Sequence, residues 1–277
     1  MTLDRPWLLS TARAERDALG RTVQYTPPDA WDAESPSAGW RTRDIVSHLA
    51  AADVAAAAVI GDEEPSELEE FRKSLAGAPF ALDEFNRWTV ERRADRPVFS
   101  VAREWGGAAD LFLARASRVS PEDWGSRQVP WVAGDLGVSY LIQSRVMEWY
   151  LHGEDILAAG GNPPRLEHPP IFCVNDLAVR TLPYALSLAG LSFPGKSIRV
   201  ELGGVGAGSW HRGLSAREAP APGKAPDALI EGRGHAFCLV AGRRADPEAF
   251  LAEGVLLTSG DDGLAETVLA NLRAFAA

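Results

Sequence analysis

The spacing of hydrophobic residues along the chain changes after residue 160. Before it, hydrophobic positions recur every three or four residues, which is the period of a helix packed on one side. This pattern predicts helices over residues 4–19, 40–61, 80–94, 100–119 and 137–159. Glycine and proline follow in the run Gly160–Pro164, which ends the last helix and marks the clearest boundary in the sequence. We therefore expect residues 1–162 to form a helical bundle.

The remaining residues, 163–277, mix helical and strand patterns. Helical patterns cover 171–189, 233–241 and 263–275, and strand patterns cover 197–202, 209–212, 228–232 and 254–258. The predicted fold class is thus mixed, a helical bundle followed by a small α+β domain.

Several polar residues predict where helices begin or where the surface lies. Thr42 stands at the expected N-cap of the second helix, and Asp44 places an acid in its positive first turn. Ser100 is the expected cap of the helix over 100–119. The acidic segment Asp62–Glu70 is expected to be solvated surface.

Composition excludes several classes of protein. The net charge of −10 and the pI near 5.1 argue against binding to nucleic acid or to an anionic membrane, because both need a basic excess. No hydrophobic run approaches the length that spans a bilayer, and the N-terminus lacks a signal-peptide pattern, so the cytoplasm is the expected location. Two cysteines are too few for a disulfide scaffold or a cysteine-rich zinc module. The many alanines and arginines hint at a GC-rich genome.

The strongest chemical signal is a polar stripe in the helix over 137–159. Glu148, His152 and Asp155 are spaced i, i+4 and i+7, so they share one face of that helix. A carboxylate and an imidazole one turn apart can bind the same metal ion, and both suit Zn²⁺.

A third ligand must then come from another helix of the bundle. His48 is the candidate, because it sits in an otherwise small and apolar helix, and Asp44 one turn earlier could orient its ring. His48, Glu148 and His152 would leave positions for water or substrate, as in catalytic sites. The alternative is that Glu148, His152 and Asp155 form a buried polar network that joins helices, without a metal.

Two runs of sequence resemble the signatures of a known family. The run Gly39–Leu49, GWRTRDIVSHL, and the run Glu148–Ile156, EWYLHGEDI, are similar to the two signatures of the DinB-like mycothiol-dependent maleylpyruvate isomerase family. Gly242-Arg243, the run Leu256–Asp261 and the final helix resemble the small sterol-carrier-like domain of that family. The resemblance covers most of the chain in the same order, and it implies a DinB-like four-helix bundle followed by that domain.

The resemblance also implies an activity. His48, Glu148 and His152 would bind a divalent metal, with zinc the expected ion, and mycothiol would be the thiol cosubstrate. The thiolate would add to a small electrophilic substrate, giving either cis/trans isomerisation or S-transfer. The expected partners are therefore small molecules, and the chain is expected to be a monomer or a homodimer.

Two further residues receive catalytic roles from the resemblance. Asp155 belongs to the second signature, and Arg243 best matches an arginine that holds a substrate carboxylate, with the adjacent Arg244 as the alternative. A surface or interdomain ion pair is the other interpretation of Arg243. Two other functions stay open: a metal enzyme of this fold that does not use mycothiol, and a non-catalytic protein that binds a small molecule.

Overall fold

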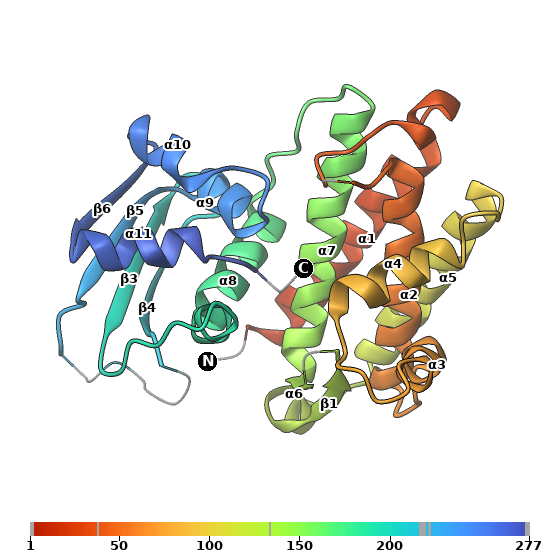
Figure 1. The fold of residues 1–277 in the computed structure, drawn as a ribbon, viewed down its shortest axis with the longest axis horizontal. Coiled ribbons are helices and arrows are strands. Elements are labelled where there is room, and N and C mark those ends of the chain that lie inside the picture. Colours follow the sequence, from red (N-terminus) through yellow and green to blue (C-terminus); the bar gives the residue numbers. More distant parts are fainter. Residues whose placement is uncertain (1–2, 38, 133, 216–219, 221–222, 275–277) are drawn as a thin grey trace. The chain divides into compact units, whose positions relative to one another are not determined.

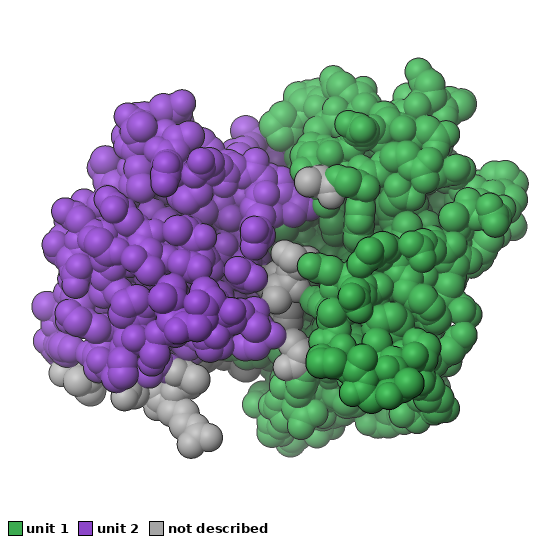
Figure 2. Space-filling model, in the orientation of Figure 1, with its two compact units in different colours: residues 1–164, 277 green, residues 165–276 purple. Residues whose placement is uncertain are grey.

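The structure, a computed structural model, describes the chain except for residues 1–2, 38, 133, 216–219, 221–222 and 275–277. The chain divides into two compact units, residues 1–164 and residues 165–276, drawn in green and purple in Figure 2. The division follows the Gly160–Pro164 run, since helix α7 (Val138–Ala159) ends directly before Gly160.

Four long helices build the first unit: α1 (Arg5–Tyr25), α2 (Thr42–Ile60), α5 (Val98–Ala116) and α7 (Figure 1). Helices α1 and α2 each pack against both α5 and α7. The buried residues of α2 include five alanines beside larger residues such as Ile45 and Leu49, both fully buried. Small side chains allow the neighbouring helices to approach α2 closely.

The starts of two helices differ from the sequence prediction. Thr42 is the first helical residue of α2 and not its N-cap, which is Arg41. The backbone N–H of Arg41 donates to Asp44 Oδ2 at 3.0 Å, so Asp44 closes the free end of the helix. Helix α5 begins at Val98 and its N-cap is Pro97, so Ser100 lies within the first turn. Proline has a fixed φ and no N–H, which suits this entry to a helix.

The acidic segment Asp62–Glu70 is mostly exposed, as the sequence predicts, but Pro65 and Leu68 within it are buried. It contains the start of α3 (Ser66–Ser74), which pairs with α4 (Leu82–Glu91). Leu68, Phe71 and Phe85 are buried between them and form the aromatic cluster of this helix pair. The cluster is extended by partly buried side chains of Leu75, Phe80, Leu82, Trp88 and Val132. Two buried positions in a short acidic run are too few for the helical period to stand out.

Short elements complete the first unit. They are η1 (Pro28–Asp32), α6 (Pro121–Ser126) and the antiparallel pair β1 (Gln128–Trp131) and β2 (Gly134–Gly137). The strand pair leads directly into α7, because β2 ends at Gly137 and α7 begins at Val138.

The second unit contains a mixed four-stranded sheet. Its strands are β3 (Ser197–Gly203), β4 (Gly208–Gly213), β5 (Ala228–Arg233) and β6 (Leu256–Gly260), in the order β4-β3-β5-β6. Strand β3 runs antiparallel to β4 and parallel to β5, and β5 runs antiparallel to β6. Alternate residues of β3 are buried, as the period of two predicts.

The helices of this unit are α8 (His168–Leu188), α9 (Gly234–Ala241), α10 (Pro247–Ala252) and α11 (Asp262–Ala270). Helix α8 packs against α9 and β4, and α11 packs against β5 and β6. Asn175 of α8 donates from Nδ2 to the carbonyls of Gly206 and Gly234 at 3.0 Å each. Gly206 has a φ of +78°, and a Cβ there would lie 2.2 Å from Ile171, so only glycine fits this contact.

The structure confirms the predicted fold class: a helical first part precedes a four-stranded sheet with helices. The predicted final helix was too long, since α11 ends at Ala270, and position 275 lies outside the described residues. Among the described helices, none has a stretch long and apolar enough to cross a membrane.

Candidate metal centre

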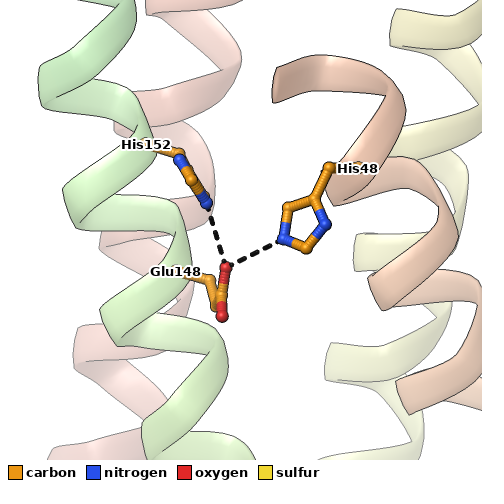
Figure 3. Close-up of side chains that lie close together, drawn as sticks. All are labelled: His48, Glu148 and His152. Atoms are coloured by element: carbon orange, nitrogen blue, oxygen red, sulfur yellow. Dashed lines mark hydrogen bonds and ion pairs between the residues drawn. The ribbon is translucent and has the colours of Figure 1, made fainter. Parts of the chain in front are cut away.

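Three polar side chains from two helices meet inside the first unit. His48 comes from α2, and Glu148 and His152 come from successive turns of α7 (Figure 3). His48 and Glu148 are 100 residues apart in sequence, yet His48 Nε2 lies 3.2 Å from Glu148 Oε2. His152 Nε2 lies 3.2 Å from the same oxygen. The packing of α2 on α7 therefore brings together the three residues that the sequence predicted as ligands.

The group has the composition and size of a metal site. Its two imidazole nitrogens and one carboxylate oxygen all lie within 4.8 Å of one another. Ligands that bind zinc at about 2.0–2.2 Å are themselves about 3–4 Å apart, so the group needs little movement to bind one ion. The side chains of His48 and His152 are about 10% exposed and that of Glu148 is 18% exposed. These residues fit a divalent cation such as zinc.

Asp155 holds one histidine in place. Its Oδ2 lies 3.0 Å from His152 Nδ1, and the aspartate is buried. A carboxylate on Nδ1 leaves Nε2 as the nitrogen that faces Glu148, and it is the usual partner behind a metal-binding histidine. The structure thus places Asp155 behind His152 rather than among the ligand atoms.

The three groups perturb one another's protonation. Burial lowers the pKa of His48 and outweighs the opposing effect of the Glu148 carboxylate. Burial acts to raise the pKa of Glu148, but hydrogen bonds from His152 and His48, with the charge of Arg145, hold this pKa well below its usual range. Burial acts to lower the pKa of His152, but Asp155 and Glu148 together raise it. These shifts favour the ionised form of Glu148, the neutral form of His48 and the protonated form of His152.

Trp40 lies against both histidines. Its ring centroid is 4.9 Å from that of His48 and 6.2 Å from that of His152, with the latter two rings nearly parallel. Trp40 precedes α2 and is half-buried, so it covers part of the centre with an aromatic surface.

The expectation that Asp44 orients His48 is wrong. Both carboxylate oxygens of Asp44 accept hydrogen bonds from the Arg41 side chain, at 3.0 and 3.1 Å. The free backbone groups at the start of α2 also attract this acid, which keeps it at the helix end.

Arg243 lies in the second unit. It is exposed, follows Gly242 at the end of α9 and has a φ of +59°. Its role toward a substrate carboxylate stays a prediction.

One buried pair next to the centre carries no signal in the sequence. Asp53 and Arg145 form an ion pair between α2 and α7, and their separation in the sequence does not predict it. The signal that could have identified them is the position of a charged residue on the apolar, buried face of each helix.

The helical unit and its His₂-carboxylate centre define the class of this protein. Residues 12–157, more than half of the chain, match the family described as Mycothiol maleylpyruvate isomerase N-terminal domain. The chain belongs to this family, which confirms the resemblance seen in the sequence.

Individual relatives have also been found. Two uncharacterized proteins of Mycobacterium tuberculosis, from strains CDC 1551 / Oshkosh and ATCC 25618 / H37Rv, are each 27% identical to the chain over 235 residues, which is 84% of the chain and of each relative. The crystal structures of the mycothiol-dependent maleylpyruvate isomerase and of a histidine-to-alanine mutant match 94% of this chain and 95% of theirs, with a TM-score of 0.61 and 14% identity. This likeness establishes a shared fold.

Proposed function

We propose that the protein is a zinc- and mycothiol-dependent enzyme that adds a thiolate to a small electrophilic substrate. The observation that carries the proposal is the convergence of His48, Glu148 and His152 from two packed helices. Membership of the isomerase family supports mycothiol as the thiol. The reaction would be either cis/trans isomerisation, as the name of the structural relative says of that protein, or S-transfer.

Each residue of the centre has a defined task in this proposal. His48, Glu148 and His152 hold the zinc ion, and three protein ligands are the number typical of catalytic sites. Zinc would supply Lewis acidity that favours the thiolate form of a thiol at neutral pH. Asp155 keeps His152 in the tautomer whose Nε2 is a ligand. Arg243 is the proposed contact for a carboxylate of the substrate.

Metal analysis is the first test of this proposal. The wild-type protein and His48→Ala are purified from unsupplemented medium, and their zinc content is measured. We expect about one zinc per chain in the wild type and none in the variant. Absence of zinc from both, even after zinc is added back, would contradict the proposal and favour a non-catalytic protein that binds a small molecule.

A thiol and substrate screen is the second test. The zinc-loaded protein is incubated with mycothiol and a series of small electrophiles, starting with maleylpyruvate. Turnover that needs both zinc and mycothiol would support the proposal. Turnover with zinc alone would replace it with a metal enzyme that does not use mycothiol.

A further inference from the structure

A buried ion pair joins the two helices that carry the metal ligands. Arg145 Nε of α7 lies 2.8 Å from Asp53 Oδ1 of α2, and the Trp149 indole N–H donates to Asp53 Oδ2 at 2.7 Å. The side chains of Asp53 and Arg145 are 0% and 2% exposed. One carboxylate of α2 therefore binds two side chains of α7.

The pair lies close to the metal centre along both helices. Arg145 precedes Glu148 by three residues, so the two side chains share a face of α7. The positive charge of Arg145 acts on both Glu148 and His48. Arg145 Nη2 is also buried and has no hydrogen-bond partner among the described residues, so Asp53 does not saturate this guanidinium.

Stability alone is a poor explanation for this pair. Removing two charges from water offsets most of their attraction, and well-packed apolar residues can often replace such a pair without loss. Burial disfavours the charge of Asp53, because it raises the pKa of the carboxyl although Arg145 and Trp149 act in the opposite direction. Because this ion pair adds little net stability and lies next to the candidate metal centre, we infer that it serves that centre.

We propose that Asp53 and Arg145 are positioning residues of the metal centre. Asp53 anchors Arg145 and Trp149 of α7 to α2, and this link between the two helices keeps Glu148 in place between the two histidines. The inference rests on the proposed function only in requiring that the centre binds a metal ion.

The decisive variant replaces both charges with apolar residues of similar size, Asp53→Leu/Arg145→Met. Zinc affinity is measured by competition with a chelator, the ligand field by the absorption spectrum of the Co²⁺-loaded protein, and stability by thermal unfolding without metal. We expect a melting temperature close to that of the wild type, because the pair contributes little net stability. Zinc affinity should fall by about 10–100-fold, the usual effect of losing a group that supports a ligand, and the cobalt spectrum should change.

Glu104→Gln is the matched control. Glu104 pairs with Arg93, whose side chain is also 2% exposed, in the same unit, and neither residue belongs to the group of candidate ligands. This variant should unfold more readily than the wild type and keep the wild-type zinc affinity and cobalt spectrum. A loss of affinity in the control equal to that in the double variant would show a general effect of broken buried pairs and overturn the inference.

The remaining outcomes are also decisive. Zinc affinity within about twofold of the wild type in the double variant, with an unchanged cobalt spectrum, would overturn the inference while leaving the proposed function intact. If the double variant does not fold, Trp149→Phe removes one hydrogen bond to Asp53 and keeps the aromatic packing. A severalfold loss of zinc affinity in Trp149→Phe would support the inference, and an unchanged affinity would overturn it. A wild-type protein that binds no metal would overturn the inference together with the proposed function.

Discussion

A single carboxylate decides how His152 faces the metal centre. Asp155 follows His152 by three residues on α7 and lies 3.0 Å from its Nδ1. Asp44 precedes His48 by four residues on α2, yet it turns to Arg41 and the free helix end. The sequence spacing alone treats these two aspartates alike. Their position along the helix separates them, because only the first turn has unpaired backbone N–H groups.

The two aspartates should therefore differ in their effect on metal binding. Asp155→Asn is expected to lower zinc affinity by about 10–100-fold, because the amide cannot hold His152 in the ligand tautomer as a carboxylate does. Asp44→Asn is the matched control and should leave the affinity unchanged. Chelator competition measures both values. Equal zinc affinities of Asp155→Asn and the wild type would show that Asp155 does not support metal binding by His152.

The helices of the first unit differ in how readily they can be predicted from the sequence. Helix α7 could be predicted to within one residue, because it is long and strongly apolar and ends at a glycine pair. Helix α3 could not, since only Leu68 and Phe71 are buried in nine residues that include three glutamates. Strand β1 alternates exposed and buried residues, but it has only four residues, one of them proline, and β2 has no buried residue. Local periodicity therefore predicts elements that bury a continuous face and misses those held by one or two side chains.

The aromatic cluster should behave as a separate unit of local stability. Phe71→Ala removes a ring that contacts Phe80, Phe85 and Trp88, and it should destabilise the α3–α4 pair by about 3–5 kcal/mol. Amide exchange is expected to accelerate across residues 66–91 and to stay slow in α2 and α7. Zinc affinity should not change. Faster exchange spread evenly over the whole first unit would show that the pair does not unfold by itself.

The segment after α4 is tied to α5 by charge. Arg93 Nη2 lies 2.8 Å from Glu104 Oε1, and this contact, together with Arg96, lowers the pKa of Glu104 against the opposing effect of burial. A lowered pKa in the folded state gives stability that is present above the pKa of the unfolded chain, about 4.3, and is lost as the pH falls through the folded value.

Glu104→Gln should accordingly have a pH-dependent effect. At pH 7 we expect the variant to lose on the order of 2 kcal/mol of unfolding free energy, the scale of hydrogen bonds to charged groups. The difference from the wild type should shrink as the pH falls below about 4, because the wild-type carboxyl is then protonated as well. Urea unfolding across this pH range measures it. A constant difference would mean that the glutamate acts by packing and not by charge.

At the scale of the whole molecule, the fold class could be predicted from the helical and strand periods of hydrophobic residues and from the Gly160–Pro164 boundary. The complete group of candidate ligands could not be predicted from residue spacing alone. The stripe of Glu148 and His152 follows from helical geometry. The contribution of His48 depends on which face of α2 meets α7. Its place in a small and apolar helix made it a candidate, and the resemblance to a family supported that choice. The Asp53–Arg145 pair could not be predicted from the sequence either, because it also depends on how α2 packs against α7.

All three candidate ligands lie in the first unit, so that unit should be sufficient for metal binding. A fragment of residues 1–164 is expected to bind one zinc ion with an affinity close to that of the full chain. Arg243, the proposed contact for a substrate carboxylate, belongs to the second unit and is absent from this fragment. Zinc titration of the fragment, with its helical content measured by circular dichroism, tests this expectation. A folded fragment that binds no zinc would contradict it.

We expect metal loading of the candidate centre to release a proton from His152. His152 keeps its proton to a higher pH than a free imidazole, because its pKa is raised. A metal ligand must be neutral, so an entering ion expels that proton into the solvent. Affinity should then increase with pH until His152 is already deprotonated, and the heat of loading should differ between buffers of different ionisation enthalpy. We therefore expect metal occupancy of the candidate centre to depend on the pH of its surroundings as well as on the supply of metal.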